Sequence, residues 1–222
     1  MAFWWLSVAC AAWPALAPTL ADAPQDGADD SALIVGIADY LLVPDVPGAT
    51  DNTQAWYDYL VEGRGVPAEN VRYLRDSEAN NGRIARMADE VATAGSGRVW
   101  AVFVGHGAPA LDGTDGLLVG VDASGDPETL ADRSVRRNDL LTALAATGRP
   151  VTAVLDTCFS GLTAAGEPLS PGLQPLVPTY AQAGPPASVA VATAAQADQF
   201  AGALPGEARP AFSYLVLGAA QG

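Results

Sequence analysis

Apolar residues gather in five short runs along the chain, each of a length suited to one β-strand. Within each run the apolar residues occupy consecutive positions, which is typical of strands that are buried on both faces. We expect these strands at residues 31–37, 71–74, 98–107, 150–156 and 188–195. Strands of this kind belong to parallel sheets covered by helices on both sides, so the runs predict an interior sheet.

Segments with a helical arrangement of apolar and polar residues separate most of these runs. They span residues 50–65, 81–95, 135–148 and 210–222, and residues 115–123 predict a small hairpin. Asp51 and Gln54 stand where a capping box would begin the first helix. The alternation predicts an α/β fold in which a mostly parallel sheet lies between two helical layers.

Three segments lie outside this alternation. Residues 1–21 are apolar and end in small residues, which is typical of a cleaved signal peptide, although no basic residue precedes the apolar run. We therefore expect residues 22–30 to be a polar linker, the protein to be exported, and the mature form to have no membrane segment. Residues 162–187 are rich in Pro and Gly and predict a long loop.

The charge of the chain restricts its partners. Its 11 basic residues are all arginine and its 25 acidic residues give a formal net charge of −14. Such a surface repels the phosphates of nucleic acid and the headgroups of an anionic membrane. A positively charged substrate would be attracted instead.

The residues best suited to catalysis are one thiol and one imidazole. The chain has a single histidine, His106, and two cysteines, of which Cys10 lies in the expected signal peptide. Cys158 would then be a free thiol in the mature protein. His106 and Cys158 each follow a predicted strand, and active sites of such sheets lie beyond the carboxyl ends of the strands. The imidazole could deprotonate the thiol, and the N–H groups of Gly107 and Cys158 could stabilise an oxyanion.

Each of these residues also has a simpler interpretation, as a buried structural cysteine and a surface histidine. One His and one Cys are too few to hold zinc. A phosphatase loop requires an arginine shortly after the cysteine, and the first one after Cys158 is Arg209. Acidic residues near His106 do not follow the spacing of a calcium loop; they are Asp112, Asp115 and Asp122. We therefore name no cofactor and assign no metal site, and calcium stays open as an alternative.

The motifs "FVGHG" and "LDTCFSG" resemble those of the caspase-like cysteine peptidases, in which the histidine lies about 50 residues before the cysteine. The Asp two positions before the Cys is similar to the metacaspase and bacterial orthocaspase branch. The resemblance covers residues 31–222 and implies a caspase–hemoglobinase fold. It implies a part like the large subunit at 31–161, the loop 162–187, and the start of a part like the small subunit at 188–222. A further strand would then be expected after the last helix, so the resemblance implies that the C-terminal part is missing.

The resemblance also implies a Cys-His dyad, with His106 as base and Cys158 as nucleophile, and cleavage after Arg or Lys. Asp156 should share a strand face with Cys158, and a carboxylate there can receive a basic side chain, with a bidentate pair favouring Arg. A structural role for Asp156 remains the alternative. The family's second pocket acid is replaced here by Asn52; Asp51 could substitute for it, or serve only as the helix cap.

The function predicted from the sequence is thus a cysteine-type endopeptidase acting on a peptide or protein substrate with a basic P1 residue. A catalytically silent caspase-like module that binds peptides or partner proteins is the alternative from another class. A different thiol hydrolase on the same fold is a third possibility.

Overall fold

The protein is described by a computed structural model that covers residue 13 and residues 25–163, 166–170, 186–194, 202–207 and 209–221. The expected signal peptide, apart from Trp13, and most of the Pro- and Gly-rich loop lie outside the described residues. Within the described part of the chain, no helix is both long and apolar enough to span a membrane.

The main sheet has five parallel strands in the order β2-β1-β3-β7-β8. The strands are β1 (Ser31–Gly36), β2 (Val71–Arg75), β3 (Val99–Val104), β7 (Val151–Asp156) and β8 (Val189–Thr193). All five strands that the apolar runs predict are present. Strands β1, β3 and β7 are almost entirely buried, as their apolar residues on both faces require.

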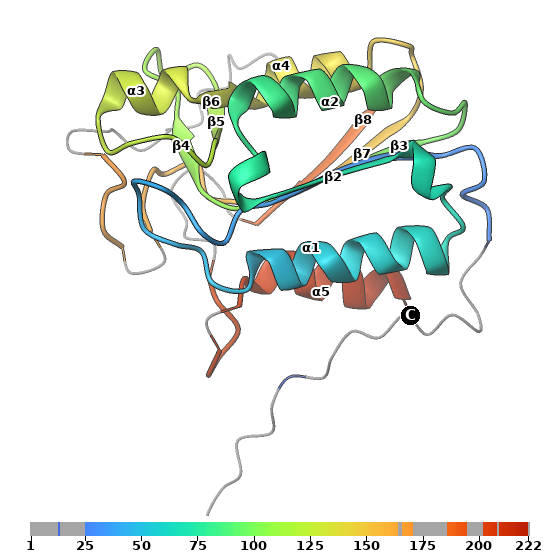
Figure 1. The fold of residues 1–222 in the computed structure, drawn as a ribbon, viewed down its shortest axis with the longest axis horizontal. Coiled ribbons are helices and arrows are strands. Elements are labelled where there is room, and N and C mark those ends of the chain that lie inside the picture. Colours follow the sequence, from blue (N-terminus) through green and yellow to red (C-terminus); the bar gives the residue numbers. More distant parts are fainter. Residues whose placement is uncertain are drawn as a thin grey trace, which may run out of the picture.

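Helices cover both faces of the sheet (Figure 1). On one face lie α1 (Ala49–Asp58), which continues as one π-helical turn (Tyr59–Gly63), and α5 (Ala211–Gln221). On the other face lie α2 (Asn81–Thr93) and α4 (Arg137–Leu144), with the short α3 (Pro127–Asp132) at one end. Two short 3₁₀ turns, Ala68–Asn70 and Asp76–Glu78, flank β2. Each helical layer closes its own apolar core against the sheet, which confirms the predicted α/β fold.

A second, antiparallel sheet lies beside the end of the main sheet, in the order β4-β5-β6. Its strands are β4 (Gly107–Pro109), β5 (Gly116–Val119) and β6 (Ser134–Arg136). The predicted strand 98–107 is therefore wrong at its end, since β3 stops at Val104. The predicted helix 135–148 begins only at Arg137, because the residues before it pair with β5.

The capping box predicted at Asp51 and Gln54 is also wrong. The helix begins two residues earlier, at Ala49, and its N-cap is Gly48, whose φ of 79° is in the left-handed region that favours glycine. No side chain caps the helix. Gln54 instead donates to the carboxylate of Asp58 at 2.6 Å and accepts a hydrogen bond from Arg75.

The register of the sheet determines which residues meet at its edge. Val104, at the end of β3, pairs with Asp156, at the end of β7. The two strands therefore end at the same level, and the residues that follow them emerge side by side. His106 and Cys158 each lie two residues beyond this last pair, so the sheet brings them to the same edge.

Candidate active site

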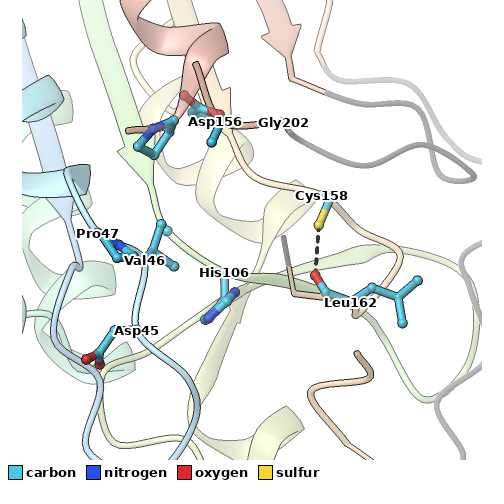
Figure 2. A pocket seen from close by; sticks show the side chains of 11 residues that line it. Asp45, Val46, Pro47, His106, Asp156, Cys158, Leu162 and Gly202 are labelled. Atoms are coloured by element: carbon cyan, nitrogen blue, oxygen red, sulfur yellow. Dashed lines mark hydrogen bonds between the residues drawn. The ribbon is translucent and has the colours of Figure 1, made fainter. Parts of the chain in front are cut away.

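A cavity opens at this edge of the sheet and contains both His106 and Cys158 (Figure 2). Three segments supply its other walls: the loop after β1, the segment after Cys158, and the residues just before α5. The lining residues outside the β3 and β7 ends are Asp45, Val46, Pro47, Leu162, Gly202, Ala203 and Pro210. The cavity thus combines residues from almost the whole length of the described chain.

The loop after β1 holds the imidazole of His106. Nε2 of His106 lies 2.6 Å from the carbonyl oxygen of Pro44. The hydroxyl of Tyr40 accepts the backbone N–H of His106 at 2.8 Å, and the two rings pack with their centroids 4.9 Å apart. A carbonyl oxygen only accepts hydrogen bonds, so Nε2 carries the proton and the neutral ring has its basic lone pair on Nδ1.

The surroundings of His106 favour this neutral ring. Burial lowers the pKa of His106 below its ordinary value, while the hydrogen bond to Pro44 and the charge of Asp45 oppose that shift. An imidazole that is neutral near pH 7 is able to accept a proton, as a general base must.

Cys158 lies on the opposite wall and is 8 % exposed. Its Sγ donates a hydrogen bond to the carbonyl oxygen of Leu162 at 3.2 Å, so the bond drawn in Figure 2 leads to Leu162 and not to His106. The free thiol predicted from the cysteine count is present. In this geometry the thiol proton is held by Leu162, so a reaction with His106 as base requires a rotation of the Cys158 side chain or a shift of Leu162.

Gly107 passes very close to the segment that carries Cys158. A Cβ at position 107 would lie 2.6 Å from the carbonyl oxygen of Cys158 and would collide with the hydroxyl of Thr157. The N–H of Val119 donates to the carbonyl of His106. Pairs alternate along an antiparallel ladder, so the next pair, Gly107 and Leu118, does not exchange hydrogen bonds, and the N–H of Gly107 points away from β5. This N–H is therefore not used by β5, although Gly107 itself is not among the residues that line the cavity.

Asp156 lines the same cavity and is only 3 % exposed. Its Oδ2 accepts two hydrogen bonds from Ser213, at 2.7 Å from the backbone N–H and 2.6 Å from the hydroxyl. Among the described residues, its Oδ1 has no hydrogen-bond partner. Burial raises the pKa of Asp156 above its ordinary value, and the bonds from Ser213 oppose the shift.

Asn52 and Asp51 differ sharply in their surroundings. Asn52 is buried, and its amide donates to the Pro210 carbonyl at 2.8 Å and to the Ser213 hydroxyl at 2.7 Å. Its carbonyl oxygen accepts a hydrogen bond from Arg209. Asn52 therefore joins α1 to the segment before α5 and has no group left for a substrate. Asp51 is exposed and is not among the residues that line the cavity.

Each acidic residue that the sequence offers for calcium is paired with an arginine. Asp112 contacts Arg136 at 2.9 Å, Asp122 contacts Arg133 at 2.9 Å, and Asp115 lies 3.3 Å from Arg137. Within the described part of the chain, no group of three His, Cys, Asp or Glu side chains could hold a metal ion. These acids stabilise the second sheet and its neighbours.

The sequence analysis did not find several residues that shape the cavity. Tyr40, Pro44 and Asp45 lie in a loop that only the fold brings to His106, and Ser213 reaches Asp156 from the last helix. The helical pattern of residues 210–222 predicted that helix, but nothing in the pattern indicated that the Ser213 hydroxyl would bind the carboxylate of Asp156.

Comparisons with known proteins agree with this fold. No family model matches the chain, and neither does any curated protein sequence. Among solved structures, caspase-1 from Spodoptera frugiperda matches with a TM-score of 0.52 and 14 % identity, over 91 % of this chain and 71 % of that one. The chain has a caspase-like fold. A protein from Geobacter sulfurreducens also matches, with a TM-score of 0.46 and 15 % identity; the match covers 59 % of this chain and half of that protein.

Proposed function

We propose that this caspase-like protein is a cysteine-type endopeptidase that uses Cys158 as nucleophile and His106 as general base, and that cleaves after basic residues. One observation carries the proposal: the only histidine of the chain and its buried free thiol line one cavity, at the ends of two paired parallel strands. A fold that resembles caspase-1 is consistent with a cysteine protease.

The first chemical step transfers a proton from the thiol to the imidazole. Nδ1 of His106 accepts the proton of Cys158 once the thiol has left the Leu162 carbonyl, and the thiolate attacks the scissile carbonyl carbon. The N–H groups of Gly107 and Cys158 donate to the oxyanion that forms. The protonated His106 then gives its proton to the leaving amine, which leaves an acyl group on Sγ.

Water completes the reaction in a second step. His106 accepts a proton from a water molecule, the resulting hydroxide attacks the thioester, and the thiolate of Cys158 departs with the proton returned to it. Throughout, the Pro44 carbonyl keeps Nε2 protonated, so that Nδ1 is the nitrogen that exchanges protons.

The free oxygen of Asp156 supports a basic P1 residue. A buried carboxylate without a cation gains stability when a guanidinium or ammonium group arrives. Because Ser213 already donates twice to Oδ2, only Oδ1 remains for a substrate. The bidentate pairing that would favour Arg is therefore not supported, and we propose that both Arg and Lys are accepted at P1.

The metacaspase and orthocaspase branch remains part of the proposal, carried by the Asp two positions before Cys158. Asn52 stands in place of its second pocket acid and is structural, and Asp45, in the loop before α1, is the other acid that lines the cavity. Export through a cleaved signal peptide at residues 1–21 also remains a proposal.

Fluorogenic peptides with Arg, Lys or Asp at P1 test the proposal, with Cys158→Ala and His106→Ala as variants. We expect the wild type to cleave the Arg and Lys peptides and not the Asp peptide. Each variant should lose at least a thousandfold in kcat/KM, because nucleophile and base act as one unit. Circular dichroism should show that both variants remain folded.

Other outcomes would favour the other functions. Near-normal activity in either variant would exclude the dyad. If no peptide is cleaved and Cys158 reacts with iodoacetamide no faster than a free thiol, the silent binding module is the better interpretation. Hydrolysis of esters without hydrolysis of peptides would indicate a different thiol hydrolase.

A further inference from the structure

The loop between β1 and α1 makes three contacts with His106. Tyr40 packs its ring against the imidazole and receives the backbone N–H of His106, and Pro44 receives the Nε2 proton. The next residue in this loop is Asp45, which lines the same cavity as His106 and Cys158. In the view of Figure 2, His106 lies between Asp45 and Cys158.

The Asp45 side chain is exposed, but the loop itself holds one oxygen of its carboxylate. Its Oδ1 accepts the backbone N–H of Tyr40 at 3.1 Å, which closes the loop on itself around the Pro44 carbonyl. The loop thus brings an aromatic ring and a carbonyl oxygen to one imidazole, and it holds the Asp45 carboxylate at the wall of the same cavity, one residue beyond that carbonyl. From this arrangement we infer that Asp45 is a positioning residue for the reaction, which stabilises the positively charged imidazole of His106 formed when Cys158 gives up its proton.

The physical argument concerns a buried ring that must become charged. Burial works against the imidazolium, since a charge in a poorly solvated site is costly. The Pro44 carbonyl offsets part of this cost with one hydrogen bond, and the charge of Asp45 raises the pKa of His106 in the same direction. When His106 becomes protonated during the reaction, the negative charge of Asp45 therefore lies in the same cavity as the imidazolium.

The other titratable groups around the ring do not supply this charge. Tyr40 remains a neutral hydroxyl, since burial raises its pKa. Asp76 binds the N–H groups of Ala38 and Asp39 and acts on Tyr40. On the opposite wall, Asp156 is bound to Ser213 and Cys158 to Leu162. Among the described acids, Asp45 is the one whose charge acts on His106.

The chain offers an unusually direct test, because its single histidine gives one set of ring signals. We would label the protein with ¹⁵N-histidine and follow the ring nitrogens by NMR as the pH changes. Asp45→Asn keeps an oxygen that can accept the Tyr40 N–H but removes the charge. The His106 pKa should then fall by roughly half a unit to one unit. High salt should lower the wild-type pKa as well, and should hardly affect the variant.

Asp39→Asn is the matched control, since Asp39 is an exposed acid in the same loop and does not line the cavity. Its His106 pKa should equal that of the wild type, and Asp45→Glu should retain most of the wild-type value. With an Arg peptide, Asp45→Asn should lower kcat by roughly threefold to tenfold with little change in KM, and shift the acid limb of the pH profile to lower pH.

An unchanged His106 pKa in Asp45→Asn, or an equal fall in Asp39→Asn, would overturn the inference. A large rise in KM with unchanged kcat would also overturn it, because Asp45 would then bind substrate instead. The NMR titration requires no substrate. It therefore decides the effect of Asp45 on His106 even if the protein cleaves no peptide, in which case only the proposed function fails.

Discussion

Two buried carboxylates, Asp115 and Asp156, have almost the same exposure and very different surroundings. Asp115 is 2 % exposed and Asp156 is 3 % exposed. Asp115 accepts the N–H of Gly116 at 2.8 Å and that of Asn138 at 3.0 Å, and lies 3.3 Å from the guanidinium of Arg137. Asp156 has only Ser213 as a partner, and no cation lies within ion-pair distance of it among the described residues.

The difference separates a structural acid from a candidate binding acid. Asp115 joins the β4–β5 hairpin to the start of α4, and each of its oxygens has a donor. Asp156 lines a cavity and keeps one oxygen without a donor among the described residues, and burial raises its pKa although the bonds from Ser213 oppose the shift. A fold retains such a group at a cost in stability, which is typical of binding and catalytic sites.

Asp156→Asn tests this comparison with the largest expected effect. The variant keeps the shape of the side chain but removes the charge that would meet a basic P1 residue. We expect kcat/KM for Arg and Lys peptides to fall by roughly tenfold to a hundredfold, mainly through KM, because a charge-assisted hydrogen bond is lost. Steady-state kinetics with the two peptides measures this fall in kcat/KM. An unchanged preference for a basic P1 residue would indicate that Asp156 is structural.

The same variant should be more stable than the wild type near neutral pH. Since the folded-state pKa of Asp156 is raised, the folded protein binds the proton more tightly than the unfolded chain does. The stabilisation that this proton gives the folded protein is fully present below the ordinary pKa of 3.8. It is lost as the pH rises through the folded-state pKa of Asp156. Thermal unfolding should therefore show a gap in favour of Asp156→Asn at pH 7 that closes toward pH 4.

Asp115→Asn should have the opposite effects: it should lower the stability and leave the substrate preference unchanged. In either orientation the new NH2 group would face a donor, either the N–H of Asn138 or the N–H of Gly116 together with the guanidinium of Arg137. We expect a loss of about 1–2 kcal/mol in the free energy of unfolding, moderated because both neighbouring arginines are partly exposed. Denaturant unfolding measures the loss. The relative rates for Arg and Lys peptides should stay as in the wild type, and a changed preference would contradict the assignment.

The smallest expected effect is the absence of autoproteolytic cleavage. Residues 162–187 contain no Arg or Lys, so an enzyme whose pocket acid requires a basic P1 residue has no site in this loop. The basic residues on either side are protected. Arg149 donates to carbonyl oxygens at the end of α2, Arg209 is bound to Asn52, and each precedes a proline. We expect the active protein to remain one uncut chain.

Intact-mass analysis of active protein, beside Cys158→Ala, checks this expectation. A cut within 162–187 that appears in the wild type and is absent from Cys158→Ala would contradict either the uncut chain or the basic P1 residue. A cut present in both proteins would point to a contaminating protease.

Most errors of the sequence analysis lie at the ends of elements; in addition, the hairpin predicted at 115–123 is the single strand β5, which pairs with β4 and β6. The apolar runs predicted every strand of the main sheet, since a strand buried on both faces must be apolar throughout. The start of α4 was wrong because Val135 and Arg136 pair with β5, a contact that overrides their helical pattern. The cap of α1 was wrong because Gly48 begins the helix in a left-handed conformation, packed closely against Arg209.

The sequence by itself determined that His106 and Cys158 would lie at one edge of the sheet, because the carboxyl ends of parallel strands lie at the same edge. Only the tertiary structure decided what surrounds them. Ser213 binds Asp156 across 57 positions of the chain, and Pro44 binds His106 across 62. Periodicity and spacing describe neighbours within one element, so they carry no information on which distant hydroxyl, carbonyl or carboxylate completes a site. The proton on Nε2, the single free oxygen of Asp156 and the charge of Asp45 beside the imidazole all depend on such distant contacts.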